Sequence, residues 1–317
     1  MLKKLRKKVI ISIVIAGVLY LAFTIYADFN NVIQAFGKFN LWLLPILLVL
    51  SFLNYFTRFL KWDYYLSIVK VKLKKIDSLS TFMSGLIMSV TPAKLGEVLK
   101  SVLVKEITGD SISKTAPIIL AERITDFLSL LIISIVGAIV FDYGGSITVI
   151  VAIFFVILIV IISNKQLALP LISISEKIPF IKKYIHNIHS AYESSYQLLK
   201  LKPLILMTLL SLVSWGFECL GYYLILINFN ADFGLLWSSF SYSFSTIVGA
   251  ISMLPGGLGL TEGSLTFLLV QKGISADIAV ATTFIVRVVT LWFAVLVGIV
   301  SLTFYQKRFG RLNSEEI

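Results

Sequence analysis

Residues 236–272 read LWSSFSYSFSTIVGAISMLPGGLGLTEGSLTFLLVQK, an apolar stretch that is interrupted in its middle. The interruption holds one proline and three glycines: Pro255, Gly256, Gly257 and Gly259. Proline removes a backbone donor and stops a helix, and glycine permits positive φ and close backbone approach. Backbone groups freed inside lipid must bind protein, water or a ligand. The stretch therefore predicts two short helices that meet at a polar break within a membrane.

A second apolar stretch of the same kind covers residues 79–104. Its break reads TPAKLGE and includes Lys94, Gly96 and Glu97, with Lys100 shortly after it. Ionisable side chains deep in a membrane are costly and usually functional. We therefore expect these residues, together with the proline and glycines of the other break, to form a polar site.

The two interrupted stretches align as an internal repeat. In each copy a glycine follows the proline by four residues, a glutamate follows the glycine, and an arginine lies 31 or 32 residues after the proline. The aligned pairs are Pro92 with Pro255, Gly96 with Gly259, Glu97 with Glu262, and Arg123 with Arg287. The repeat units are residues 41–141 and 203–304. The competing interpretation is a chance likeness between two apolar segments bent by proline and glycine.

The whole chain has the composition of a membrane protein. Of its 317 residues, 58% are hydrophobic and 14% are charged, against about 25% charged in soluble domains. Six uninterrupted stretches are apolar enough to span a bilayer: 9–27, 41–60, 115–141, 146–163, 203–228 and 277–304. We predict an all-α polytopic integral membrane protein, a single transmembrane domain over residues 1–317. It would have about six full spans plus re-entrant segments at 79–104 and 236–272.

The basic residues predict the orientation of the chain. If both interrupted stretches are re-entrant, 22 of the 28 Lys and Arg residues lie on the cytoplasmic side, and only Lys38 and Lys272 lie in external loops. If the first stretch crossed fully, 11 of the 22 would move outside, against the positive-inside rule. We therefore predict both termini in the cytoplasm and a cytoplasmic amphipathic connector at 165–202. The net charge of +11 follows from this pattern, so we expect no nucleic-acid partner.

This orientation makes the two repeat units inverted relative to each other. Inverted repeats with broken helices at matching positions are typical of alternating-access transporters, whose substrate site lies where the breaks meet. The helix after each break would direct its N-terminal N–H groups, which carry partial positive charge, toward that site. The pattern therefore predicts a transport site for an anionic group in the cytoplasmic membrane.

Further charged residues in the apolar stretches complete the predicted site. Arg287 is the single basic residue of its span and needs an acidic partner, for which Glu262 or Glu97 is the candidate. The full set of predicted substrate-binding residues is Lys94, Gly96, Glu97, Lys100, Glu122, Arg123, Asp126, Pro255, Gly256, Gly257, Gly259, Glu262 and Arg287. The competing interpretation is a set of structural ion pairs that lock the breaks to the spans. Arg58 and Lys61 are interpreted as interfacial side chains that reach lipid phosphates.

Four motifs together resemble the membrane part of the lysylphosphatidylglycerol synthase/flippase family. They are TRFLKW around Arg58–Trp62, TPAKLGEVLK from Thr91, ERITD from Glu122, and LPGGLGLTE from Leu254. The resemblance covers nearly the whole chain and implies movement of a lipid across the bilayer. Relatives with a soluble C-terminal domain transfer lysine to phosphatidylglycerol there. Because only 13 residues follow the last predicted span, we expect no aminoacyl transfer by this chain.

These observations lead to one main hypothesis and two alternatives. We expect a transporter whose membrane partner is an anionic or aminoacylated phospholipid or a polyprenyl-phosphate-linked sugar, and a homo-oligomer is compatible with the sequence. The first alternative is an enzyme acting on a lipid phosphate, although no DxD motif supports it. The second is a scaffold that transports nothing. We expect no catalytic residue, cofactor or metal, and interpret His186 and His189 as a solvated helix face.

Overall fold

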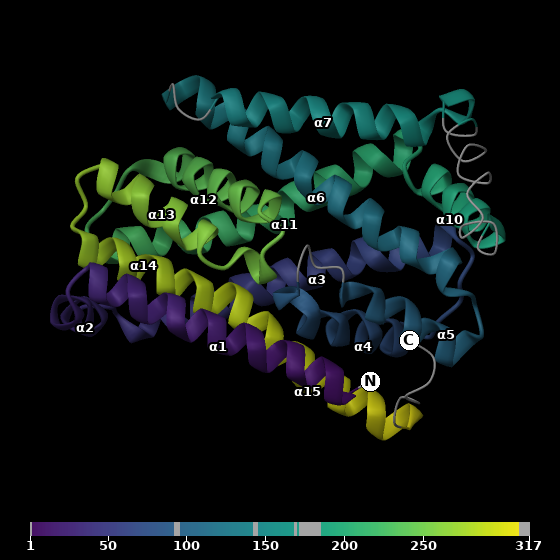
Figure 1. The fold of residues 1–317 in the computed structure, drawn as a ribbon, viewed down its shortest axis with the longest axis horizontal. Coiled ribbons are helices and arrows are strands. Elements are labelled where there is room, and N and C mark those ends of the chain that lie inside the picture. Colours follow the sequence, from purple (N-terminus) through teal and green to yellow (C-terminus); the bar gives the residue numbers. More distant parts are fainter. Residues whose placement is uncertain (1, 92–95, 142–144, 168–169, 171–184, 311–317) are drawn as a thin grey trace.

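The computed structural model describes residues 2–91, 96–141, 145–167, 170 and 185–310. Within these ranges the chain forms helices and turns and no strand. The elements are α1 (Leu2–Tyr26), α2 (Phe29–Gly37), η1 (Leu41–Leu43), α3 (Leu44–Ile68), α4 (Lys75–Gly85), η2 (Leu86–Val90), α5 (Leu99–Thr108), α6 (Ile112–Phe141), α7 (Gly145–Ser163), α10 (Ile185–Leu198), α11 (Leu201–Asn228), α12 (Gly234–Ile251), η4 (Pro255–Gly257), α13 (Leu260–Gln271), α14 (Ala276–Arg287), η5 (Val288–Trp292) and α15 (Phe293–Phe309). Figure 1 shows their arrangement.

The apolar helices are those of a multi-pass membrane protein. Four helical segments are long and apolar enough to cross a bilayer: Leu41–Ile68, Ile112–Phe141, Leu201–Asn228 and Ala276–Phe309. A fifth would be α1 together with α2, which meet at a bend of 100°. The predicted stretch 146–163 falls on α7, where Ala152–Ile162 counts as a shorter apolar helix among the described residues. The all-α polytopic class is therefore confirmed, with four or five candidate spans among the described residues.

Each interrupted stretch forms a helical hairpin. The α12 helix packs against α13 on the two sides of η4, and α4 packs against α5 in the same way. Gly256, Gly257 and Gly259 adopt φ of 61°, 67° and 87°, which only glycine adopts without strain. The breaks also meet, because η2 contacts η4. Pro92 and Lys94 lie outside the described residues.

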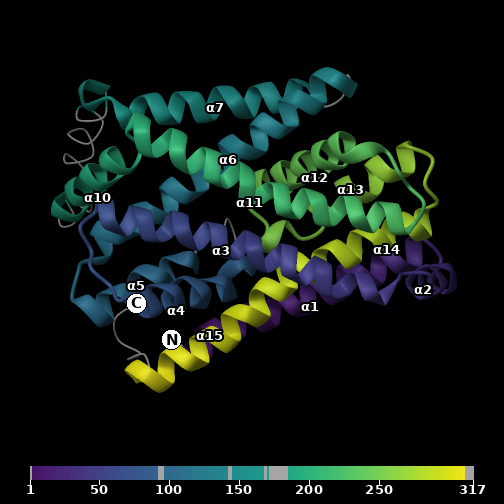
Figure 2. The same cartoon turned by 180° about the vertical axis from the view of Figure 1, so that it is seen from behind.

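The two halves of the chain interlock through their long helices. The α6 helix of the first half packs on α12 of the second, and α15 of the second half packs on α4 of the first. Between these crossings, α3 packs against α11 (Figures 1 and 2). One glycine lies where α6 crosses α12, and another lies where α15 passes η2. A Cβ added to Gly137 would come within 2.3 Å of Phe240, and one added to Gly298 within 2.2 Å of the Ile87 nitrogen.

We expect Gly298→Ala to lower the free energy of unfolding by about 1–3 kcal/mol, the usual cost of overpacking. The added methyl would meet backbone atoms of η2, which cannot rotate aside. Gly216→Ala in α11 is the matched control, because nothing lies within 4 Å of its added Cβ. Alanine favours helix by up to about 1 kcal/mol over glycine, so the control should be neutral or stabilising. Unfolding in detergent measures both; equal effects would contradict the close contact.

The predicted connector 165–202 contains α10, which packs against α6 and α7. Lys165 and Glu193 form an exposed ion pair of 3.0 Å between the region after α7 and α10. The hydrogen bond from Lys165 lowers the pKa of the Glu193 carboxyl. Residues 171–184 lie outside the described residues, and they hold the basic residues on which the amphipathic prediction rests.

Candidate functional site

The first break contributes Lys100, which is buried in a pocket of carboxylates and aromatic rings. Its Nζ lies 2.5 Å from Glu122 and 3.3 Å from Glu97. It also lies 4.8 Å from the ring centre of Trp62 and 5.1 Å from that of Phe82. Both carboxylates are buried with it. Lys100 therefore pairs with Glu97 of its own segment and with Glu122 of α6.

Asp126 on α6 is the second centre of charge and joins three basic side chains. Its carboxylate lies 2.5 Å from Lys61, 3.2 Å from Arg123 and 3.6 Å from Arg58. Lys61 also donates to Ser211 of α11 at 2.7 Å. The interpretation of Arg58 and Lys61 as interfacial residues is wrong. The α3 helix continues to Ile68, so both side chains lie well inside it and are almost fully buried.

The second break is held by one ion pair. Arg287 Nε donates to Glu262 at 2.6 Å, and its Nη2 donates to the Gly256 carbonyl at 2.5 Å. This pair confirms Glu262 as the partner of Arg287. Glu262 also accepts from the Gly259 N–H at 2.7 Å. The chain's own carboxylate thus occupies the start of α13, where helix geometry favours an anion.

The first break has a comparable local anchor in Thr91. Its hydroxyl donates to the Met88 carbonyl at 2.6 Å and accepts from the Gly96 N–H at 3.0 Å. A Cβ at Gly96 would lie 2.8 Å from the Thr91 side chain, so a larger residue would push this anchor apart. Both breaks are therefore built from hydrogen bonds that replace the missing helical ones, as buried backbone requires.

A cavity of about 550 Å³ lies where the two halves meet. Arg58, Arg123 and Arg287 line it, and Asp126 and Glu218 are its acidic members. Of the predicted site residues, Arg123, Asp126, Gly256, Gly257 and Arg287 line the cavity. The other described members of the predicted set do not line it: Gly96, Glu97, Lys100, Glu122, Pro255, Gly259 and Glu262. The three glutamates and Lys100 lie behind the residues that do. Two of these glutamates hold lining arginines, because Glu97 pairs with Arg123 and Glu262 with Arg287.

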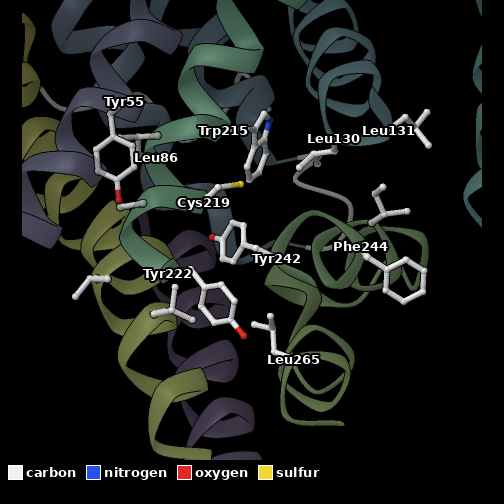
Figure 3. Packing of buried hydrophobic residues seen from close by; sticks show 14 of the residues in the cluster. Tyr55, Leu86, Leu130, Leu131, Trp215, Cys219, Tyr222, Tyr242, Phe244 and Leu265 are labelled. Atoms are coloured by element: carbon white, nitrogen blue, oxygen red, sulfur yellow. The ribbon is translucent and has the colours of Figure 1, made fainter. Parts of the chain in front are cut away.

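Aromatic side chains form much of the remaining wall. Tyr55, Trp215 and Tyr242 line it, and Figure 3 shows them among the buried residues around Cys219. Tyr242 donates to Glu218 at 2.7 Å. Three buried donors of the wall have no hydrogen-bond partner among the described residues: Arg58 Nε, Arg123 Nε and Trp215 Nε1. Unpaired buried donors are costly, so they favour a ligand that accepts hydrogen bonds.

One rim of the cavity is apolar and exposed. Ile150 and Phe154 of α7 line it and are 67% and 60% exposed. On the opposite side Ile251, Met253 and Leu254, which end α12 and lead into η4, line it and are exposed as well. The α7 helix packs on α6 through Phe155, which stacks on Phe127 with the ring centres 4.6 Å apart. The cavity is therefore cationic at its inner end and apolar where it opens.

Among the residues that the structure describes, ten Arg, Lys, Asp and Glu side chains surround the cavity and its two breaks, and we call them the charge cluster. Five are basic: Arg58, Lys61, Lys100, Arg123 and Arg287. Five are acidic: Glu97, Glu122, Asp126, Glu218 and Glu262. In their ordinary ionised forms their charges sum to zero. Arg58, Lys61 and Glu218 are absent from the set predicted from the sequence.

The fold and the cavity define a multi-pass membrane protein in which two helical hairpins meet at a buried charged centre. Residues 9–298 match the family described as the lysylphosphatidylglycerol synthase TM region, and the chain belongs to this family. The chain is 31% identical to a UPF0104 membrane protein of Methanocaldococcus jannaschii, over 66% of this chain and 90% of the relative. It is 23% identical to a UPF0104 membrane protein of Methanothermobacter thermautotrophicus over 87% of each chain.

Proposed function

We propose that this protein moves a lipid with a phosphate-bearing headgroup across the cytoplasmic membrane. The observation that carries the proposal is the cavity itself, which has three arginines inside and an exposed apolar rim. Arginine binds phosphate through paired N–H donors. The headgroup would bind at Arg58, Arg123 and Arg287, while the acyl or prenyl chains would stay in the bilayer beyond Phe154 and Met253.

The arrangement of the two halves supports alternating access. Each half has a long helix, then a hairpin with a central break, then a second long helix that packs on the hairpin of the other half. We propose that residues 41–141 and 203–304 are inverted repeats and that both hairpins are re-entrant. The site between their breaks would then face one side of the membrane at a time.

The distribution of basic residues supports the proposed orientation. Figure 1 shows that α1 begins and α15 ends at the same end of the molecule, where α5 and α10 also lie. A shallow surface hollow lies at this end, and it is lined by Arg308 and by a loop with Lys70, Lys72 and Lys74. Under the positive-inside rule this end faces the cytoplasm, with six full spans if α1 and α7 both cross.

The test is headgroup translocation in proteoliposomes that contain fluorescent lipids of several classes. Phosphatidylglycerol, lysyl-phosphatidylglycerol and a polyprenyl phosphate provide phosphate headgroups, and a glucosyl-diacylglycerol provides an uncharged one with matched acyl chains. A membrane-impermeant quencher reports how much label has crossed. We expect the protein to accelerate at least one phosphate lipid and to leave the glycolipid unchanged. Equal acceleration of the glycolipid, or no acceleration of any class by folded protein, would refute the proposal.

A further inference from the structure

The wall of the cavity offers polar groups that a phosphate alone would not use. A phosphodiester accepts hydrogen bonds and donates none, and the three lining arginines supply donors for it. Glu218 of α11, by contrast, is an acceptor that lines the same cavity. It accepts from the Tyr242 hydroxyl at 2.7 Å and lies close enough to Arg58 for attraction between their charges. A carboxylate can accept about four hydrogen bonds, so one with these partners retains capacity for a donor of the ligand.

Trp215 is the complementary group, and it lies one turn before Glu218 on the same helix. It lines the cavity, is 5% exposed, and its Nε1–H has no hydrogen-bond partner among the described residues. A buried indole N–H normally has a partner, and it can only donate. Residues three apart are neighbours on a helix surface, with roughly 5–6 Å between their Cβ atoms. The α11 helix therefore brings a donor and an acceptor to the cavity on one face.

Two hydroxyl side chains, one from each break, line the same cavity. They are Ser89 of η2 and Thr261 of α13, and neither hydroxyl forms a hydrogen bond with a described residue. The Thr261 hydroxyl packs against Gly249 and Gly257, and a Cβ at either glycine would collide with it. A hydroxyl both donates and accepts. The breaks therefore add groups that can bind further hydroxyls of a ligand.

The donor and the acceptor of α11 discriminate between classes of headgroup. An ammonium group only donates hydrogen bonds, so it could bind Glu218 but not the Trp215 N–H. A second phosphate only accepts, so it could bind Trp215 but not Glu218. A hydroxyl does both, and a polyol carries several. A hydroxylated headgroup is therefore the class that satisfies both residues.

We infer that the headgroup carries a polyol or a sugar on its phosphate, and that hydroxyls of this group bind the Trp215 Nε1–H and the Glu218 carboxylate. The inference rests on the proposed function and names its substrate class, a phosphodiester whose second alcohol bears free hydroxyls. The phosphate would lie at the arginines and the hydroxyls beside α11. A site built to bind a hydroxyl discriminates against the analogue that lacks it, so a phosphodiester without hydroxyls should cross more slowly.

The experiment compares two phospholipids that differ only in these hydroxyls. Phosphatidylglycerol carries a dihydroxypropyl group on its phosphate, and phosphatidylpropanol carries a propyl group in the same place. Both have one negative charge and the same labelled acyl chains. The quencher assay in proteoliposomes gives each rate after subtraction of the rate in vesicles without protein. We expect phosphatidylglycerol to cross at least about tenfold faster, the factor that corresponds to one hydrogen bond to a charged group.

A second pair of lipids identifies the source of the hydroxyls. A glucosyl prenyl phosphate and a methyl prenyl phosphate are both phosphodiesters, and only the first carries a sugar. Faster crossing of the glucosyl lipid would assign the hydroxyls to a sugar, and faster crossing of phosphatidylglycerol would assign them to glycerol. A preference within either pair supports the inference.

Two variants test the residues of α11. Trp215→Phe keeps an aromatic ring and removes the N–H, and Glu218→Gln keeps the size and removes the charge. In each, the rate for the hydroxylated lipid should fall more than the rate for its partner, so the ratio of the two rates falls. A folding defect would lower both rates together and leave the ratio unchanged. The matched controls are Trp42→Phe, at a position 86% exposed, and Glu193→Gln, in an exposed ion pair; both should keep the wild-type ratio.

Each contrary result has a separate meaning. Equal rates within both pairs would overturn the inference and leave the proposed function standing, because phosphate lipids still cross. An unchanged ratio in both folded variants would overturn it as well, since the hydroxyls would then bind elsewhere. Crossing of a polyprenyl monophosphate without crossing of either hydroxylated lipid would also overturn it. If no phosphate lipid of any class crosses, the proposed function itself is refuted.

Discussion

Arg123→Ala is expected to slow translocation of a phosphate lipid by about tenfold to a hundredfold while the protein stays folded. Arg123 lines the cavity, and its Nε has no hydrogen-bond partner among the described residues, so this donor is available to a phosphate. Hydrogen bonds to charged groups contribute about 1.5–3 kcal/mol, which corresponds to this range of rates. The quencher assay in proteoliposomes measures the change.

The matched control for this variant is Lys165→Ala. It removes the same charge from an exposed position near α10, away from the cavity, and should leave the rate unchanged. Thermal unfolding of both variants shows whether the fold is retained. Arg123 is partly exposed, and its partners Glu97 and Asp126 would keep Lys100 and Lys61 respectively, so loss of its ion pairs should lower stability only modestly. A wild-type rate in folded Arg123→Ala would remove Arg123 from the proposed site.

Lys100→Ala is expected to lower the free energy of unfolding by about 3–5 kcal/mol, the cost of removing one partner from a buried ion pair. Both Glu97 and Glu122 would lose a buried cation, and the Lys100 stem would leave space beside Gly85. Denaturant titration in detergent measures the loss. Lys100 does not line the cavity, so we expect the substitution to lower the stability of the protein and to affect the cavity arginines only as a consequence.

Two further variants distinguish charge from packing at this position. Lys75→Ala breaks an exposed pair with Asp63 and should cost less than about 1 kcal/mol. Adding Glu122→Gln to Lys100→Ala neutralises one stranded carboxylate and should recover part of the lost stability. If the double variant is no more stable than Lys100→Ala, the loss comes from packing against Trp62 and Phe82 rather than from charge.

The ion pair of the second break illustrates what could be predicted from residue types. Arg287 is the single basic residue of the apolar span 277–304, and an isolated cation at such depth requires an acid. Glu262 is aligned with Glu97 of the other repeat unit, and the structure joins Glu262 to Arg287 at 2.6 Å. Here the requirement for a counter-charge left two candidates, Glu262 and Glu97, and the structure decided between them.

Arg58, Lys61 and Glu218 show where that reasoning stops. Near the end of an apolar run, a basic side chain can reach the membrane surface or turn into the protein. The amino-acid sequence does not distinguish these two orientations. The α3 helix extends beyond the predicted end of its span, to Ile68, which places Arg58 and Lys61 inside. Glu218 lines the same cavity as Arg58 and Arg287 because α11 packs against α3 and α14.

The sequence by itself determined the membrane class, the family, the two breaks and the need of Arg287 for an acidic partner. These follow from composition, from backbone chemistry at proline and glycine, and from the cost of a lone charge in lipid, all of which act locally along the chain. Only the tertiary structure decided which charges share one cavity and where that cavity opens. Those features depend on how α3, α6 and α11 pack across the two halves, because contacts between distant segments follow from shape and not from residue type.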